Sequence, residues 1–280
     1  KALIVGINDY SHSPLKNAVS DAEHIAAIIS QNDDGSKNFH CKTFISSEVE
    51  ITESLLRSSI RNHFKYEADV ALFYFAGHGI GNEYGGYLIP QDTKHHDEGI
   101  AFSELLTLAN NSPIKEIVIL IDCCYSGFMG NSPIIGDDKA ILRKGISILT
   151  SSAFNQPSLE AFGGGIFTKL ICNALSGEAA DLLGNVTVAG LYNHADKLLG
   201  PWEQRPIFKA HLSSMITLRK CVPIVPLHEL KKSYEEVFII STCNRLSIYA
   251  FGKSHNEILN YFDQFGNYRQ YLSILPDSEI

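Results

Sequence analysis

The sequence lacks the features that mark several common protein classes. Its 280 residues contain no run of about 18 apolar residues, the length needed to span a bilayer, so we expect no membrane contact. Only 23 residues are Lys or Arg against 31 Asp or Glu, and this net charge of −8 argues against binding DNA through bulk positive charge. With 45% hydrophobic and 19% charged residues, the composition is otherwise that of a soluble globular protein.

The cysteines also lack any paired spacing. The six stand without a Cys-x-x-Cys pair and without the density of a disulfide scaffold, at positions 41, 123, 124, 172, 221 and 243. A zinc ribbon and a disulfide framework are therefore not expected. Scattered cysteines favour a reducing compartment, and Lys1–Gly6 lacks the pattern of a secretory signal, so we expect a cytoplasmic protein. The chain opens inside a strand pattern, so Lys1 need not be the native start.

Short apolar runs alternate with helical periodicity through most of the chain. This pattern predicts an α/β fold with a mostly parallel sheet. The runs Asp69–Phe75 and Glu116–Ile121 are apolar on both faces, which is typical of central strands covered by helices on each side. Further strands are expected at Ala2–Ile7, Lys42–Ile45, Ile146–Thr150 and Pro206–Phe208, with a hairpin at Tyr84–Pro90. Helices are expected at Asn17–Ile29, Thr52–Phe64 with Thr52 as N-cap, Phe102–Asn110, Phe167–Leu175 and Val188–Leu199.

Two prolines within Val222–Pro226 interrupt this alternation and indicate a linker. We therefore divide the chain into a main domain over residues 1–220, a linker over 221–227 and a smaller α/β segment over 228–280. Within the last segment the pattern predicts a helix at Leu227–Tyr234, a strand at Val237–Ser241 and a helix at Asn256–Phe265.

Two of the central strands end in residues that suit covalent catalysis. One is followed by His78 between two glycines and the other by Cys124, which lies 46 positions later. The carboxyl ends of parallel strands meet at one edge of a sheet, so the two side chains are expected to face a common crevice. A thiolate there can attack a carbonyl while an imidazole manages the leaving group's proton. Taken singly, His78 could be a turn residue and Cys124 a buried apolar one.

The segments around these two residues resemble the motifs of a known family. Tyr74-Phe-Ala-Gly-His-Gly79 and Asp122-Cys-Cys-Tyr-Ser-Gly127 are similar to the histidine and cysteine motifs of caspase-like peptidases, in particular metacaspases and prokaryotic caspase homologues. The resemblance covers about residues 1–210 and implies a caspase-like α/β/α sandwich. Further matching segments are Val5–Asn8, Asp21-Ala22, Tyr87–Pro90, Leu149–Ser152 and Gly164–Thr168.

The resemblance assigns roles to individual residues. It implies that Cys124 is the nucleophile and His78 the acid/base, with the backbone N–H groups of Gly79 and Cys124 forming the oxyanion hole. It also implies that Asp21 and Asp122 line the pocket for the residue before the cleaved bond. Two carboxylates select a cation, so cleavage after Arg, and less efficiently Lys, is expected. Otherwise Asp21 merely starts a helix and Asp122 shapes a turn.

Two features bear on regulation. The segment Phe128–Lys144 occupies the place where caspase-like chains are often cut, so Lys139, Arg143 and Lys144 are candidate self-cleavage sites. Many metacaspases require calcium near the position of Asp92 and the cluster His95–Glu98, yet histidines are poor calcium ligands. We therefore predict no metal site and no cofactor, with calcium dependence left as an alternative.

The C-terminal segment carries a second resemblance. Phe238–Tyr249 is similar to the Ser-Thr-Cys-Asn-Arg segment of the N-terminal domain of glutamyl-tRNA reductase, and Cys243 matches its thioester-forming cysteine. Ser247 stands where that family has glutamate, and no Gly-rich dinucleotide-binding unit follows, so a complete reductase is excluded. The alternatives are a module that binds a regulatory protein or tRNA, and a packing appendix with a buried Cys243.

Together these patterns predict a cysteine endopeptidase that acts on protein or peptide substrates after basic residues. The family resemblance implies a regulated effector in a prokaryotic stress or antiviral cell-death pathway. A catalytically idle scaffold, whose C-terminal module binds a partner or tRNA, is the alternative. Aminoacyl-thioester chemistry centred on Cys243 is a third alternative.

Overall fold

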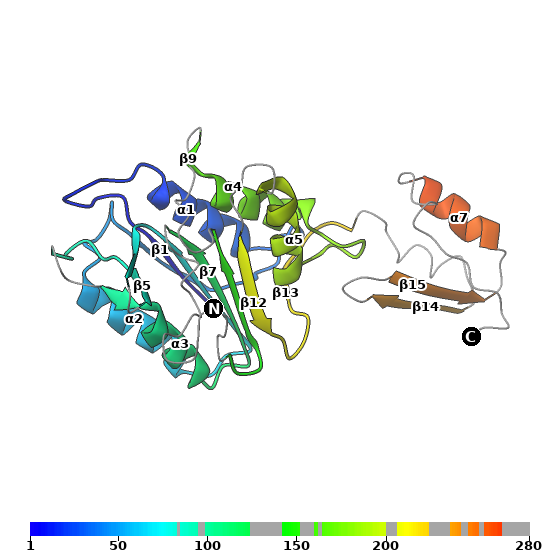
Figure 1. The fold of residues 1–280 in the computed structure, drawn as a ribbon. Coiled ribbons are helices and arrows are strands. Elements are labelled where there is room, and N and C mark those ends of the chain that lie inside the picture. Colours follow the sequence, from blue (N-terminus) through cyan, green and yellow to red (C-terminus); the bar gives the residue numbers. More distant parts are fainter. Residues whose placement is uncertain are drawn as a thin grey trace.

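A six-stranded sheet in strand order β12-β8-β7-β3-β1-β2 forms the centre of the computed structural model (Figure 1). All pairings are parallel except that of the edge strand β12 with β8. The strands are β1 (Ala2–Gly6), β2 (Cys41–Ile45), β3 (Val70–Ala76), β7 (Glu116–Asp122), β8 (Ile146–Thr150) and β12 (Ile207–His211). The structure describes residues 1–82, 85–94, 99–123, 142–151, 160–161, 164–199, 206–223, 236–241, 246–251 and 255–264. The expected α/β class with a mostly parallel sheet is confirmed.

Helices cover both faces of this sheet, because successive side chains of the central strands point to opposite faces and are apolar on both. Tyr74 and Leu120 belong to the core under α1 (Ala18–Ile29), α4 (Ile166–Asn173) and α5 (Val188–Leu199). Phe73 and Ile119 belong to the opposite core under α2 (Glu53–Lys65) and α3 (Phe102–Asn110). The sandwich predicted from the two doubly apolar runs is therefore present (Figure 1).

Local chemistry explains where two of the helices lie. The Thr52 hydroxyl accepts a hydrogen bond from the Leu55 N–H at 3.2 Å, so the expected N-cap of α2 is confirmed. Helix α1 lies so close to β1 that a Cβ on Gly6 would collide with the Ala18 carbonyl oxygen and lie 2.7 Å from the Ala22 Cβ. Only glycine permits this approach, which brings the N-terminal half of α1 to the carboxyl end of β1.

The hairpin after β3 differs from the expected one. It begins at Gly79, with β4 (Gly79–Asn82) paired antiparallel to β5 (Gly85–Leu88), and β6 (Ile100–Ala101) adds a third strand. The prediction of a hairpin over Tyr84–Pro90 was wrong in its start, because the two glycines in β4 give that strand a low intrinsic propensity.

Several short elements had no counterpart in the sequence pattern. A two-stranded antiparallel ribbon joins β11 (Asn185–Thr187) to β13 (Thr217–Lys220). The short strands β9 (Glu160–Ala161) and β10 (Gly164–Gly165) also pair, and a π-helical segment η2 (Ala174–Glu178) continues α4. These elements have only two to five residues each, too few for periodicity to reveal them.

The C-terminal segment contains an antiparallel pair, β14 (Glu236–Ser241) with β15 (Leu246–Phe251), and helix α7 (His255–Asp263). The predicted strand at Val237–Ser241 and helix at Asn256–Phe265 are confirmed within two residues, whereas β15 had not been predicted. The predicted helix at Leu227–Tyr234 lies outside the described residues. Within the described part of the chain, no helix combines the length and hydropathy needed to cross a membrane.

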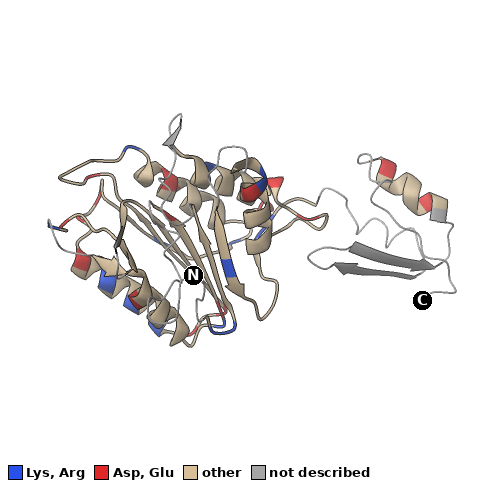
Figure 2. Cartoon of the chain, viewed as in Figure 1, with Lys and Arg blue, Asp and Glu red and all other residues tan. Residues whose placement is uncertain are grey.

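Charges on the surface are mixed rather than sorted by sign. Helix α2 begins with Glu53 and carries Arg57, Arg61 and Lys65 along its length (Figure 2). There the Arg57 guanidinium contacts Glu53 one turn earlier and Glu104 on α3, and Arg61 also contacts Glu104 at 3.1 Å. The two arginines of this helix are therefore paired with carboxylates.

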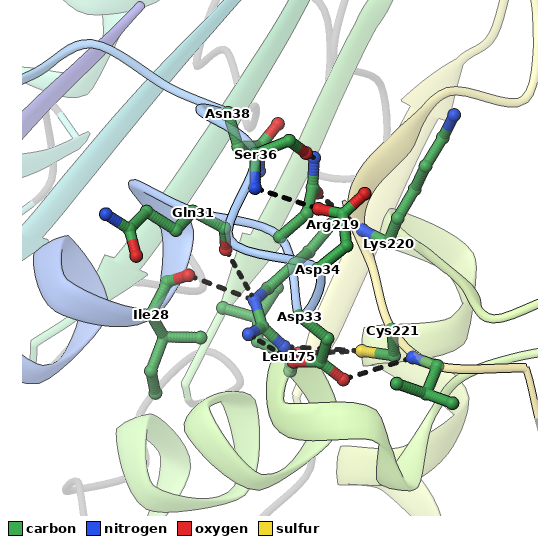
Figure 3. Close-up of polar contacts among 12 residues, drawn as sticks. Ile28, Gln31, Asp33, Asp34, Ser36, Asn38, Leu175, Arg219, Lys220 and Cys221 are labelled. Carbon is green, nitrogen blue, oxygen red and sulfur yellow. Dashed lines mark hydrogen bonds and ion pairs between the residues drawn. The ribbon is translucent and has the colours of Figure 1, made fainter.

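The partly buried guanidinium of Arg219 ties the end of β13 to the rest of the main domain (Figure 3). The Nε of Arg219 donates to the carbonyl oxygens of Ile28 and Gln31, at 3.0 and 2.9 Å, at the C-terminal end of α1. Its Nη1 donates to the Leu175 carbonyl at 2.9 Å in η2, and its Nη2 pairs with Asp33 at 2.5 Å. One side chain thus joins α1, η2 and β13 through backbone groups that would otherwise lose their donor.

We predict that Arg219→Met lowers the free energy of unfolding by about 2–4 kcal/mol, because it leaves Asp33 and three carbonyl groups without this donor. Urea denaturation monitored by circular dichroism measures the change. The matched control is Lys220→Met at the exposed neighbouring position, expected to stay within about 0.5 kcal/mol of wild type. Equal midpoints for the two variants would contradict the role given to Arg219.

Candidate active site

The histidine loop and the end of β7 begin from the same rung of the sheet. Ala76, the last residue of β3, is paired with Asp122, the last residue of β7. The next amide, that of Gly77, donates to the Asp122 carbonyl at 3.3 Å. His78 therefore leaves the sheet directly beside the strand that leads to Cys123 and Cys124. Cys123 is buried in the core under α2 and α3, and Cys124 lies outside the described residues.

The loop after β1 fixes the His78 imidazole. The Nε2 of His78 lies 2.6 Å from the Ser13 carbonyl oxygen. A carbonyl can only accept, so Nε2 carries the proton and the neutral ring has Nδ1 as its acceptor nitrogen. Ser13 adopts a positive φ of 59°, and the ring of Tyr10 packs on the imidazole with centroids 4.5 Å apart. The ring orientation is thus set by a carbonyl and an aromatic face of the same loop.

The hydroxyl of Tyr10 is inserted into the first rung of the hairpin that follows His78. It accepts the N–H of His78 and donates to the carbonyl of Ile89, both at 2.9 Å, while the Ile89 N–H bonds the His78 carbonyl directly at 3.1 Å. Hydrogen-bonded and non-hydrogen-bonded pairs alternate along an antiparallel ladder, so the next pair, Gly79 with Leu88, is non-hydrogen-bonded. The N–H of Gly79 therefore points away from β5.

The two predicted pocket residues, Asp21 on α1 and Asp122 on β7, lie together; we call them the acidic pair. Their exposed fractions are 6% and 9%. The Asp21 Oδ2 accepts the N–H of Gly165 at 3.1 Å. A Cβ on Gly165 would lie 2.7 Å from the Asp122 Oδ2 and 3.3 Å from the Asp21 Oδ2, so one glycine separates the two carboxylates. Any larger residue at position 165 would displace the acidic pair.

Groups from α4 and β3 surround the acidic pair. The Thr168 hydroxyl donates to the Asp122 Oδ2 at 2.6 Å, and the Tyr74 hydroxyl lies 2.6 Å from the same Thr168 oxygen. Burial, followed by the charges of Asp21 and Asp122, raises the pKa of the Cys172 thiol to about 12. Cys172 is therefore a neutral thiol at physiological pH and a poor nucleophile.

The structure brings together four of the predicted site residues, His78, Gly79, Asp21 and Asp122, at the carboxyl ends of β1, β3 and β7 or directly above them. Sequence reasoning missed the roles of Tyr10, Ser13, Tyr74, Gly165 and Thr168. Three of these lie within the family motifs at Tyr74–Gly79 and Gly164–Thr168, and those motifs were the available signal. Cys243 and Lys139 lie outside the described residues.

Arg143, one of the candidate self-cleavage residues, is held by backbone groups. Its guanidinium donates to the carbonyl oxygens of Ile114 at 2.5 Å, Lys144 at 2.7 Å, Ala109 at 3.3 Å and Lys115 at 3.4 Å. Lys144 itself is exposed. Cleavage after Arg143 therefore requires these contacts to break first.

Asp92, named with the calcium alternative, caps a helix. Its Oδ1 accepts the N–H of Glu53 at 2.7 Å, at the start of α2. The cluster His95–Glu98 lies outside the described residues. The described residues thus give Asp92 a structural contact in the first turn of a helix.

The family model of the caspase domain matches residues 1–246. The chain belongs to the caspase-domain family. The resemblance to caspase-like cysteine peptidases is thereby confirmed, whereas the resemblance of the C-terminal segment to glutamyl-tRNA reductase stays a prediction. The match extends beyond residue 220 and through β14, and the predicted domain boundaries stay predictions.

Two solved structures share the fold of this chain. Caspase-1 from Spodoptera frugiperda is 13% identical, with a TM-score of 0.53, over 79% of this chain and 90% of that one. Protein GSU0716 from Geobacter sulfurreducens is 15% identical, with a TM-score of 0.57, over 76% of this chain and 93% of that one. No curated protein sequence matches the chain. At these identities the likeness shows the fold of the caspase domain.

We predict that Tyr10→Phe lowers the stability of the caspase domain by about 1–2 kcal/mol, because the His78 N–H and the Ile89 carbonyl lose their bridging hydroxyl. The ring that packs on His78 is retained. Urea denaturation measures the loss, and amide hydrogen exchange should show faster exchange of the His78 N–H. Tyr66→Phe, at an exposed position, is the control. Unchanged exchange at His78 would show that the hydroxyl bridge is dispensable.

Proposed function

We propose that the chain is a cysteine endopeptidase that cleaves after Arg, and less efficiently after Lys, with His78 and Cys124 as its catalytic dyad. The acidic pair is the observation that carries this proposal. Two carboxylates from α1 and β7 converge on Gly165, next to the strand end from which His78 departs. Two negative charges in one place attract a cationic side chain and repel an anionic one. Arginine is favoured over lysine because its planar guanidinium can bond two carboxylates at once.

The geometry around His78 supports a definite path for the proton. Since Nε2 donates to the Ser13 carbonyl, Nδ1 takes the thiol proton of Cys124 as its sulfur attacks the substrate carbonyl carbon. The developing oxyanion is stabilised by the N–H of Gly79, which points away from β5, and by that of Cys124. The C–N bond then breaks, and Nδ1 returns the proton to the leaving amine. Water hydrolyses the thioester in the second half of the reaction.

Peptide substrates test the specificity directly. We expect efficient cleavage of a fluorogenic peptide after Arg, slower cleavage after Lys and none after Asp, all abolished in Cys124→Ala. Asp122→Asn should reduce kcat/KM for the Arg peptide by about 100-fold or more, because it removes one charge facing a buried cation. Cleavage after Asp with none after Arg would overturn the assignment.

A matched control separates the pocket from the overall charge. Asp69→Asn removes an exposed carboxylate that pairs with Lys115 at the amino end of β3, far from His78 along the strand. It should leave kcat/KM for the Arg peptide unchanged.

Thiol labelling decides between the enzyme and the idle scaffold. Rapid alkylation of Cys124 near neutral pH supports the enzyme, and an inert Cys124 supports the scaffold.

We further propose that the enzyme cuts itself at Lys139, Arg143 or Lys144. Because the Arg143 side chain is held by four carbonyl groups, one of them that of Lys144, cleavage after Arg143 or Lys144 should be slow compared with cleavage after Lys139. Mass spectrometry of purified protein over time should show fragments ending at these residues in wild type. A Cys124→Ala protein that fragments at the same bonds would exclude self-cleavage.

The C-terminal segment, residues 228–280, is proposed to act as an accessory module that binds a regulatory protein or tRNA. Its resemblance to the N-terminal domain of glutamyl-tRNA reductase around Cys243 supports this role. Strand β14 before Cys243 and helix α7 after it also fit that resemblance. The full chain is proposed to serve a prokaryotic stress or antiviral cell-death pathway. An electrophoretic mobility shift with total tRNA tests the RNA arm; no shift at micromolar protein would leave a protein partner as the proposal.

A further inference from the structure

A buried chain of two hydroxyl groups leads from the sheet to the acidic pair. Tyr74 is fully buried on β3 and Thr168 is fully buried in the first turn of α4. The Tyr74 hydroxyl lies 2.6 Å from the Thr168 Oγ1, which in turn lies 2.6 Å from the Asp122 Oδ2. The dyad chemistry described above requires neither hydroxyl.

The carboxylate of Asp122 fixes which hydroxyl donates in each hydrogen bond of this hydroxyl chain. A carboxylate oxygen accepts, so the Thr168 hydroxyl spends its one proton on Asp122. The Thr168 oxygen must then accept from Tyr74, whose hydroxyl is the donor of the first link. Each bond polarises the next, which strengthens the donation to the carboxylate. The chain is therefore matched to an ionised Asp122.

The setting of Asp122 makes such a donor necessary. The titratable groups that face it among the described residues are Asp21 from α1, Tyr74 from β3 and Cys172 from α4. A second carboxylate nearby and burial both favour protonation of one member of the acidic pair. A hydrogen bond donated to the charged form opposes this. For Asp21 the backbone N–H of Gly165 does the same, at 3.1 Å.

We propose that Thr168, supported by Tyr74, is a specificity-determining positioning residue that holds Asp122 ionised and oriented for the guanidinium of the substrate. This inference rests on the proposed cleavage after Arg. It concerns the same pocket, yet it adds a residue from α4 to which the proposed dyad chemistry gives no role. The hydroxyl chain thus sets the pH range over which the pocket accepts a cation.

Thr168→Val tests the proposal, because valine keeps the shape of threonine and removes the hydroxyl. For the Arg peptide at pH 7 we expect KM to rise by about 10- to 100-fold with a much smaller change in kcat, as for a lost contact to a charged group. The acid limb of the kcat/KM profile should move to higher pH, because the pKa of Asp122 rises when its donor is removed. Thr168→Ser should restore both values toward wild type.

Two further variants keep the test decisive. Tyr74→Phe should shift the acid limb in the same direction by a smaller amount, and it reports on the chain even if Thr168→Val folds poorly. Thr217→Val removes a half-buried hydroxyl that bonds Asn185 in the ribbon of β11 and β13, and it should change neither KM nor the profile. Circular dichroism confirms that each variant is folded.

The outcomes separate this inference from the function on which it rests. If wild type cleaves after Arg while a folded Thr168→Val keeps the wild-type KM and acid limb, the hydroxyl chain has no role and only this inference fails. The same holds if KM rises but Thr168→Ser does not restore it. If wild type does not cleave after Arg at any pH, the proposed function fails and this inference fails with it.

Discussion

The parallel pairing of β3 with β7 is the constraint on which the rest of the site depends. Seven consecutive residues of each strand are in register, from Val70 with Glu116 to Ala76 with Asp122. Both strands are buried on both faces, so a shift of register would disrupt the close packing of their side chains against the helices on each side. The two strands therefore end level, and this pairing places the histidine loop beside the acidic end of β7.

The sequence was most informative where burial alone decides the structure. The central strands, α3, α5 and β8 could be predicted because apolar runs and helical periodicity report burial directly. His78 could be found from its place at the end of a central strand, whereas Asp21 and Asp122 were found through the resemblance to caspase-like peptidases. The Gly-rich β4 could not, since its strand conformation comes from pairing with β5 and not from its own residues.

Most of the contacts that the sequence could not reveal are hydrogen bonds to backbone groups. The Ser13 carbonyl that orients His78 lies 65 positions earlier, and the carbonyls that hold Arg219 lie up to 191 positions earlier. Every residue has a carbonyl group, so such partners leave no mark in the choice of side chain. Tyr10 and Thr168 are different, because their hydroxyls are specific, but only the fold reveals what they bond.

Helix α1 and the α4–η2 helix connect the acidic pair at their N-terminal ends with Arg219 at their C-terminal ends. At their N-terminal ends these helices supply Asp21, Gly165 as N-cap and Thr168 to the acidic pair. At the other end Arg219 joins the carbonyls of Ile28 and Leu175 (Figure 3). The helices that carry the pocket residues are therefore the same ones that Arg219 holds together at their C-terminal ends.

The most direct test of the central claim is to identify the bonds cut in a host lysate by wild type and by Cys124→Ala, using mass spectrometry of new N-termini. The account predicts that cuts found only with wild type follow Arg in most cases and Lys in the remainder. Cuts that follow Asp, or a wild-type pattern that does not differ from that of Cys124→Ala, would contradict it.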